Sequence, residues 1–372
     1  MIKALFITNI PAPFMTQLTQ SMNQYDEIEF TLVAVDPRFT HRGKHWLDTL
    51  GYSENIYNFE FDDDLTTWMI KIVTSISPDI VFTTFNRGPV FSTLVKLKKS
   101  FGFRFGKWNE PYIASSLLKR IQTPLRNFVL KKIWRKQLDF MLLIDDRAIK
   151  FYRNFVKKPQ MVFRFPYYED VPKTKIRKKK VPIGEKVCFL FSGRLAKEHN
   201  IKRMAMAFLR LYKKYPDKFE IIISAEGPEK KWLDRIQKKT GNCLKIRYDT
   251  KFDEWNDRLR PFTDSHVLLL PSSGSGWGLV INEALALGLP VISTDQVGAS
   301  RAILDHMING MIIKPKIREI YDALEYFILY PDDIERFSMN ALAIKNTYSL
   351  SIGSERLLGI FQSILMQFKS SS

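Results

Sequence analysis

The sequence is poor in cysteine and in long apolar runs, and both shortages narrow what the protein can be. Its 372 residues include two cysteines, Cys188 within the apolar run 187–191 and Cys243 beside 244–248. We expect both thiols to be buried, and neither a disulfide framework nor a metal site is indicated. No run of about 18 uninterrupted apolar residues occurs, so no membrane-spanning helix is predicted.

Other familiar signals are missing as well. The apolar part of 1–9 is too short and too strand-like for a secretory signal, so we expect a cytoplasmic protein. His41, His45, His266 and His306 are not spaced as metal ligands, and we interpret them as structural. No repeat with a period of about 20–50 residues is evident. What remains is a globular chain long enough for two domains, each with its own core.

Acidic residues are few relative to basic ones, and the imbalance is local. The chain carries 57 Lys and Arg against 39 Asp and Glu, a formal net charge of +18. Residues 101–180 alone hold 21 Lys and Arg against 6 Asp and Glu, a difference of +15. This one segment therefore accounts for most of the charge.

Much of that charge lies in a predicted helix within 116–136. Thr123 and Pro124 are typical of a helix cap and a first helical residue. Four apolar residues recur at helical spacing and predict the face that packs on the core: Leu125, Phe128, Val129 and Ile133. The basic residues around them are Lys119, Arg120, Arg126, Lys131, Lys132, Arg135 and Lys136.

Two interpretations of this helix are open. It can leave a solvated basic face, or it can lie on anionic lipid, where each basic side chain contributes about 1 kcal/mol near the surface. Seven charges of one sign with no acid between them exceed what solubility needs. We therefore favour the membrane.

Strand and helix patterns alternate along the chain, which is typical of an α/β protein with mostly parallel sheets. In the first part we expect strands at 2–7, 29–35, 79–84, 138–144 and 160–165, and helices at 13–25, 66–75 and 91–99. After a stretch rich in proline and lysine, the pattern restarts with strands at 187–192, 219–224, 244–248 and 266–270, and helices at 201–215, 230–240 and 279–287. The predicted division is a first Rossmann-like domain at 1–170, a basic linker at 171–185, a second Rossmann-like domain at 186–348, and a C-terminal helix at 349–372 that crosses back to the first domain.

The segment 271–294 is the most informative part of the sequence, because it follows a buried strand with a glycine loop, a helix and another strand. Gly274, Gly276 and Gly278 let the backbone turn tightly against a ligand. The free N–H groups of the following helix favour an anion there. Glu283, one turn into that helix, can accept hydrogen bonds from sugar hydroxyls. A ligand site is favoured over a simple tight turn.

Four segments resemble, in order and spacing, the donor domain of retaining GT-B glycosyltransferases of family 4, which are also called glycosyl transferases group 1. These segments are residues 191–200, residues 223–228, the glycine loop and Asn309-Gly310. More weakly, 148–152 and 166–170 resemble the end of that family's acceptor domain. The resemblance implies a GT-B fold, in which two Rossmann-like domains have parallel sheets facing a central cleft. It also implies that the first domain binds the acceptor and the second a nucleotide sugar, without metal or cofactor.

The resemblance assigns residues to the donor site. Arg194 matches the arginine that stabilises the leaving diphosphate, and Glu283 matches the glutamate that contacts the ribose. His199 occupies the position of a family lysine, whose charge Lys197 or Lys202 is expected to replace. Ser275 occupies the position of a second glutamate, which contacts the donor sugar. Further predicted donor-binding residues are Gly227, Gly276, Trp277, Gly278 and Leu279.

Acceptor-side candidates lie in the first domain. Glu110, at the end of a predicted strand, is expected to orient or deprotonate the acceptor hydroxyl, and general-base help is typically worth about 10²–10⁴ in rate. A capping or ion-pair role for Glu110 is the alternative. Asn109 lies beside it, and Asn9 and Pro11 belong to the loop after the first strand. Arg194, Glu110 and His199 are the predicted catalytic residues.

The leading hypothesis is a metal-independent retaining hexosyltransferase on the cytoplasmic face of the cell membrane, acting in surface polysaccharide synthesis. Its expected partners are a nucleotide-sugar donor, a glycan or polyisoprenoid-linked acceptor, and an anionic membrane surface. Ser275 and His199 motivate a second hypothesis, a non-catalytic GT-B protein that binds a nucleotide sugar or glycan. Charge alone suggests a nucleic-acid binder, but the basic segment holds no recognisable RNA- or DNA-binding motif, so no nucleic-acid partner is expected.

Overall fold

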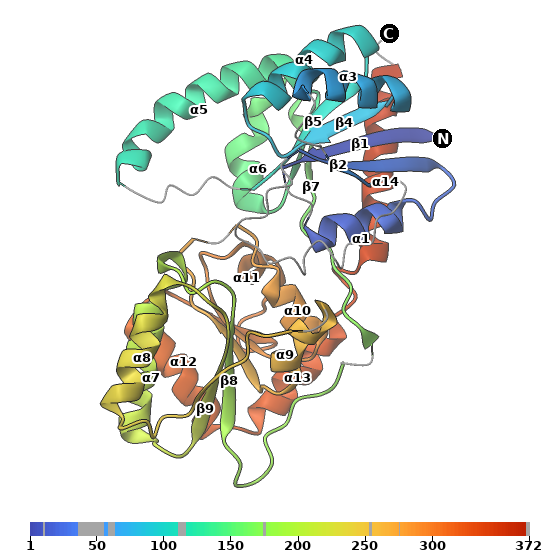
Figure 1. Cartoon of the computed structure of the whole chain (residues 1–372). Coiled ribbons are helices and arrows are strands. Elements are labelled where there is room, and N and C mark those ends of the chain that lie inside the picture. Colours follow the sequence, from blue (N-terminus) through green and yellow to red (C-terminus); the bar gives the residue numbers. More distant parts are fainter. Residues whose placement is uncertain are drawn as a thin grey trace. The chain divides into compact units, whose positions relative to one another are not determined.

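The computed structural model describes residues 1–9, 12–35, 56–58, 64–110, 117–173, 176–252, 255–274 and 276–369. The chain divides into two compact units (Figure 1). Unit 1 comprises Met1–Glu169 and Ser349–Ser372, and unit 2 comprises Asp170–Tyr348. The stretch 171–185, expected as a linker, is therefore counted with unit 2.

Unit 1 contains a seven-stranded parallel sheet in the order β3-β2-β1-β4-β5-β6-β7. The strands are β1 Ile2–Thr8, β2 Ile28–Ala34, β3 Ile56–Asn58, β4 Ile80–Thr83, β5 Arg104–Asn109, β6 Phe140–Leu143 and β7 Val162–Arg164. Parallel strands with helical crossovers confirm the predicted α/β class, although β3 had no predicted counterpart. The strand order reverses between β1 and β4.

Helices cover both faces of this sheet. They are α1 Pro13–Met22, α3 Leu65–Ile76, α4 Pro89–Phe101, α5 Leu117–Gln137, α6 Asp146–Tyr152 and α14 Leu350–Lys369. Figure 1 shows α14, in red, beside α1, in blue, and a hydrogen bond of 2.8 Å joins Ser354 Oγ to Ser21 Oγ. On this face Phe361 of α14 packs 5.7 Å from the ring of Phe82, so the last helix completes the core of the first unit.

The long helix α5 corrects two predictions. It begins at Leu117, so Pro124 lies inside it and is not its first residue. Phe128, Val129 and Ile133 are 67%, 47% and 41% exposed, so the predicted core face was wrong for these three residues. The buried face is instead formed by Leu130 and Trp134, whose spacing of four residues is also helical.

Trp134 explains which face of α5 is buried. Its ring packs 5.8 Å from Tyr152 and 5.7 Å from Phe155, and its Nε1 donates to the carbonyl oxygen of Asn86 at 3.1 Å. Burying one large ring among others removes more apolar surface from water than the smaller side chains opposite could. Apolar and basic side chains therefore share the exposed side of α5.

Unit 2 contains a six-stranded parallel sheet in the order β10-β9-β8-β11-β12-β13. Its strands are β8 Val187–Ser192, β9 Phe219–Ser224, β10 Ile246–Tyr248, β11 Val267–Leu270, β12 Val291–Thr294 and β13 Gly310–Ile313. Its helices are α7 Ile201–Lys214, α8 Lys231–Lys239, α9 Arg260–Thr263, α10 Val280–Ala286, α11 Gly298–Ile303, α12 Ile317–Leu329 and α13 Asp333–Ala343. Figure 1 shows α7, α8 and α12 on one face of the sheet and α9, α10 and α13 on the other.

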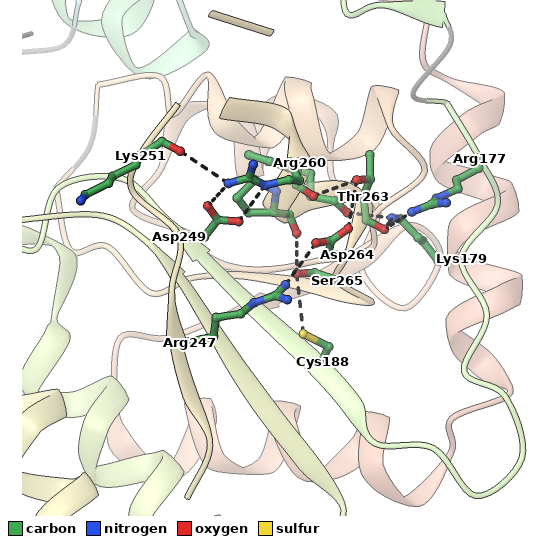
Figure 2. A network of polar contacts seen from close by, with 12 residues as sticks. Arg177, Lys179, Cys188, Arg247, Asp249, Lys251, Arg260, Thr263, Asp264 and Ser265 are labelled. Carbon is green, nitrogen blue, oxygen red and sulfur yellow. Dashed lines mark hydrogen bonds and ion pairs between the residues drawn. The ribbon is translucent and has the colours of Figure 1, made fainter. Parts of the chain in front are cut away.

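The stretch after residue 176 packs on unit 2 through Lys179, which is 4% exposed. Its Nζ donates to the carbonyl oxygens of Phe262 and Thr263 at 2.7 and 2.9 Å, and Arg177 donates to the same Thr263 oxygen at 2.7 Å (Figure 2). Burial, and then the charge of Arg177, lowers the pKa of Lys179 to about 7. These bonds attach the predicted linker to the end of α9.

The two cysteines differ in environment. Cys188 is buried in β8, and burial raises the pKa of its thiol to about 12. Cys243 is exposed, so the prediction that both thiols are buried was wrong here. The neighbouring Leu244, 1% exposed, fills the core in its place. Among the described residues, no helix has the length and hydropathy that crossing a bilayer requires.

Candidate functional site

The loops that carry most of the predicted donor residues follow β8 and β11, the two strands between which the strand order of unit 2 reverses. In open parallel sheets, ligands bind outside the carboxyl ends of the strands at such a switch point. The loop after β8 spans 193–200, and the loop after β11 spans 271–279. Both predicted loops therefore lie at the edge where a ligand is expected.

Hydrogen bonds join these two loops into one body. The backbone N–H of Ser273 donates to the carbonyl oxygen of Glu198 at 2.8 Å. Asn200 Nδ2 donates to the carbonyl oxygen of Pro271 at 2.7 Å. His199 Nδ1 lies 2.6 Å from Ser272 Oγ. The loops are thus held in a fixed relation before any ligand arrives.

A third loop, after β9, joins them through Gly227. Leu195 N–H donates to the carbonyl oxygen of Glu226 at 2.8 Å, and Glu229 N–H donates to that of Leu195 at 3.0 Å. Gly227 has φ of 147°, and a Cβ there would lie 2.5 Å from the Leu195 oxygen. Glycine is therefore required for this close approach.

Arg194 reaches solvent at this edge, with its side chain 70% exposed. Its Nη2 lies 2.5 Å from Glu198 Oε1. Burial opposes ionisation of Glu198, but a backbone N–H and Arg194 outweigh it and lower the pKa of that carboxyl. An anion at Arg194 has to share it with Glu198, a partner that sequence reasoning missed although the spacing of four residues was a signal.

His199 and the nearby lysines occupy different positions. Burial lowers the pKa of His199 against the opposing charge of Glu198, so its imidazole is neutral at pH 7 and provides a hydrogen bond rather than a charge. Lys197 is exposed just after Arg194. Lys202 Nζ lies 4.7 Å from the ring centre of Trp232. Of the two lysines, Lys197 is the one at the loop.

The glycine loop is anchored by Trp277. This side chain is 1% exposed, and its Nε1 donates to Asn282 Oδ1 at 2.9 Å. The backbone N–H groups of Gly298 and Ala299 donate to the carbonyl oxygens of Gly276 and Trp277 at 3.2 and 2.8 Å. These bonds therefore anchor the loop to α10 and α11. Gly278, with φ of 88°, and Leu279 then lead into α10, as predicted.

Glu283 forms an ion pair that sequence reasoning missed. Its Oε1 lies 2.8 Å from Arg258 Nη2, and both side chains are 13% exposed. Arg258 comes from the short 3-10 helix Trp255–Leu259, 25 residues earlier, and no spacing pattern connects the two. A carboxylate oxygen has more than one lone pair, so Glu283 can accept a ribose hydroxyl while it remains paired with Arg258.

The acceptor-side candidates lie at the corresponding edge of unit 1. Asn9 follows β1, next to a contact of 3.2 Å between Thr8 Oγ1 and Thr84 Oγ1 across the switch point. Asn109 ends β5, and its Nδ2 donates to the carbonyl oxygen of Glu110 at 3.1 Å. Glu110 Oε1 accepts a hydrogen bond of 2.6 Å from the hydroxyl of Tyr167, a further residue that sequence reasoning missed.

Some candidates fall outside the described residues: Pro11, Ser275, His41 and His45. In the described ranges, no group of three or more His, Cys, Asp or Glu is arranged to hold a metal ion. His266 Nδ1 accepts from the backbone N–H of Cys188 at 2.9 Å, and His306 Nδ1 accepts from that of Ile312 at 3.1 Å. Both rings therefore bind backbone groups.

Residues 172–343 match the family model described as glycosyl transferases group 1. Unit 2 is a group 1 glycosyltransferase domain. An alpha-D-kanosaminyltransferase of Streptomyces kanamyceticus is 23% identical over 260 residues, which are 67% of each chain. Six further curated relatives are matched over 53% of their own length or less.

Solved structures match the chain over the residues of both units. Anabaena HepE in complex with UDP has a TM-score of 0.73 at 13% identity, covering 97% of this chain and all of that one. The apo form of the lipopolysaccharide outer core galactosyltransferase WaaB has a TM-score of 0.72 at 16% identity, covering 97% and 99%. These likenesses concern the fold, and they confirm the predicted GT-B class for a chain whose second unit is a group 1 domain.

Proposed function

We propose that the protein is a retaining, metal-independent hexosyltransferase that transfers a sugar from a nucleotide-sugar donor to a glycan or lipid-linked acceptor. The observation that carries the proposal is the edge of unit 2, where hydrogen bonds join the loop of Arg194 to the glycine loop, and where Glu283 on the following helix pairs with Arg258. Transfer expels a nucleoside diphosphate, and a preorganised cation stabilises the charge that develops on it.

Each predicted residue has a role in this proposal. Arg194, supported by Lys197, binds the diphosphate. Glu283 accepts hydrogen bonds from the ribose, and His199 keeps the two loops together through Ser272. HepE, whose structures contain UDP and UDP-glucose, is a precedent for the donor class on this fold.

We further propose that unit 1 binds the acceptor at the inner face of the cell membrane, in surface polysaccharide synthesis. The exposed side of α5 supports this location, because Phe128 and Ile133 are exposed beside the basic residues Lys132, Arg135 and Lys136. Apolar side chains that insert between lipids and cations that bind anionic headgroups are the two contributions of an interfacial helix. WaaB, named for the lipopolysaccharide outer core, supports the polysaccharide role by analogy.

Incubation with a panel of nucleotide sugars tests the proposal. We expect release of nucleoside diphosphate from one donor, faster with an acceptor glycan, unchanged by a metal chelator, and with the anomeric configuration retained in the product by NMR. Tight binding of a nucleotide sugar without release of diphosphate would instead support the non-catalytic hypothesis. Inversion of the anomeric centre or loss of activity with the chelator would contradict the corresponding part of the proposal.

A further inference from the structure

The carboxylate of Glu110 is held in place by a tyrosine that no sequence pattern connects to it. Glu110 directly follows β5, and Tyr167 lies after β7, 57 residues later. The Tyr167 hydroxyl donates to Glu110 Oε1 at 2.6 Å, and Glu110 is exposed. Both residues lie at the carboxyl ends of parallel strands, the edge at which such sheets bind ligands.

Ring packing fixes the tyrosine. Its ring lies 4.4 Å from that of Phe14, in the first turn of α1, and 5.2 Å from that of Trp108 in β5, at an interplanar angle of 74°. Trp108 is itself fixed, since its Nε1 donates to the carbonyl oxygen of Phe165 at 3.0 Å. Two elements, α1 and β5, therefore hold the Tyr167 ring, and its hydroxyl directs the carboxylate.

The tyrosine also remains a donor at physiological pH. Burial, followed by the charge of Glu110 and the hydrogen bond to it, raises the pKa of Tyr167 well above its ordinary value. A carboxylate has roughly four lone-pair positions, so Glu110 can accept hydrogen bonds from more than one donor at a time. A carboxylate at this edge repels phosphate and attracts hydroxyl donors.

We propose that Glu110 and Tyr167 form a subsite for the hydroxyl groups of a neutral sugar at the end of the acceptor. Tyr167 is a positioning residue that acts through Glu110. The subsite rests on the proposed transferase function for its place in a reaction. Its binding of sugar is a separate property and is tested separately.

The test measures binding of wild-type protein to an array of neutral glycans, followed by calorimetry with the glycan bound best. Tyr167→Phe keeps the ring packing and removes the hydroxyl, so we expect the Kd for that glycan to rise about tenfold, as for a hydrogen bond to a charged group. Glu110→Gln should weaken binding at least as much. The double variant should be no weaker than Glu110→Gln alone, because Tyr167 acts through Glu110. Tyr330→Phe, an exposed tyrosine of unit 2, is the control and should bind as wild type.

Three results would overturn the subsite: no neutral glycan bound by the wild type, wild-type affinity in Tyr167→Phe, or additive effects of the two substitutions. Nucleoside diphosphate affinity, measured in parallel, should stay unchanged, and an equal loss there would mean that Tyr167 is only structural. If Tyr167→Phe does not fold, Glu110→Gln decides, since Glu110 is exposed. Glycan binding without sugar transfer would refute the proposed transferase function but would still support the subsite. Sugar transfer with an acceptor KM that Tyr167→Phe does not change would refute the subsite but would support the transferase function.

Discussion

The carboxyl-end edges of the two sheets share a topology and differ in chemistry. In unit 2, backbone hydrogen bonds join three loops, and the exposed side chains of Arg194 and Lys197 place two cations on them. In unit 1, packed aromatic rings hold the carboxylate of Glu110. We propose that each carboxyl-end edge binds a ligand, and that the side chains on its loops decide between an anion and a neutral hydroxyl group. The following predictions test this contrast between the units, from the largest expected effect to the smallest.

The largest effect concerns the membrane binding that we propose for unit 1. Neutralising Lys131, Lys132, Arg135 and Lys136 together should weaken binding to anionic vesicles by about three orders of magnitude, because four charges contribute about 1 kcal/mol each. Co-sedimentation with vesicles at physiological salt measures it.

A matched variant removes the same charge from unit 2, by neutralising four exposed lysines: Lys213, Lys218, Lys238 and Lys239. This control should bind vesicles nearly as the wild type does. If both variants lose binding equally, net charge rather than α5 is responsible. If neither does, the basic side of α5 is only solvated surface.

The second effect concerns the anion site of unit 2. Arg194→Ala should slow transfer about 10²–10³-fold, because it removes a charge-assisted contact to the leaving diphosphate. Arg318→Ala on α12 is the matched control, since Arg318 is also exposed and also pairs with an acid four residues later, Asp322. Steady-state turnover of a folded Arg194→Ala protein at the wild-type rate would remove Arg194 from the site.

The third effect concerns stability and pH, through the buried Lys179. Its pKa is about 7 in the folded protein and about 10.4 when exposed, so between these values the unfolded chain binds the extra proton. The free energy of unfolding should therefore gain up to about 1.4 kcal/mol per pH unit from this residue as pH rises above 7.

Lys179→Met should lack this contribution, which urea unfolding between pH 7 and 9 can measure as a difference from wild type. Lys173→Met, at an exposed position, should keep the wild-type slope. The same slope in wild type and Lys179→Met would show that burial does not perturb this lysine. Lys107 in β5, whose pKa burial lowers well below its ordinary value, offers the corresponding test in unit 1.

The smallest effect concerns the ribose contact. Glu283→Gln should weaken binding of the nucleoside diphosphate about tenfold without changing which sugar is transferred, since a neutral amide accepts a weaker hydrogen bond than a carboxylate. Glu283→Asp keeps the negative charge that faces Arg258 but shortens the side chain by one methylene. Comparison of the two variants therefore separates loss of the ligand contact from loss of the ion pair. Calorimetry with uridine, guanosine and adenosine diphosphates measures this affinity. An unchanged affinity would count against a contact between Glu283 and the ribose.

Features set by residues close together in the sequence could be predicted, whereas features set by contacts between distant residues could not. The glycine loop, α10 and the strands on either side of it are set by patterns within a few residues, and the predicted elements agree with the observed ones. The buried face of α5 was missed because two apolar faces compete on that helix, and contacts of Trp134 with Tyr152 and Phe155 decide between them. Exposure of Cys243 was missed because its neighbour Leu244 fills the core.

The sequence by itself determined the α/β class, the family of the second unit and the loops that carry Arg194 and Glu283, because periodicity and glycine placement are local properties of the chain. Only the tertiary structure decided the partners of these side chains. Arg258 and Glu283 are 25 residues apart in the sequence, and Glu110 and Tyr167 are 57 apart. Neither separation corresponds to the period of a helix or a strand. Such pairs depend on which strands lie side by side and how the rings between them pack, so they exist only once the sheets have formed.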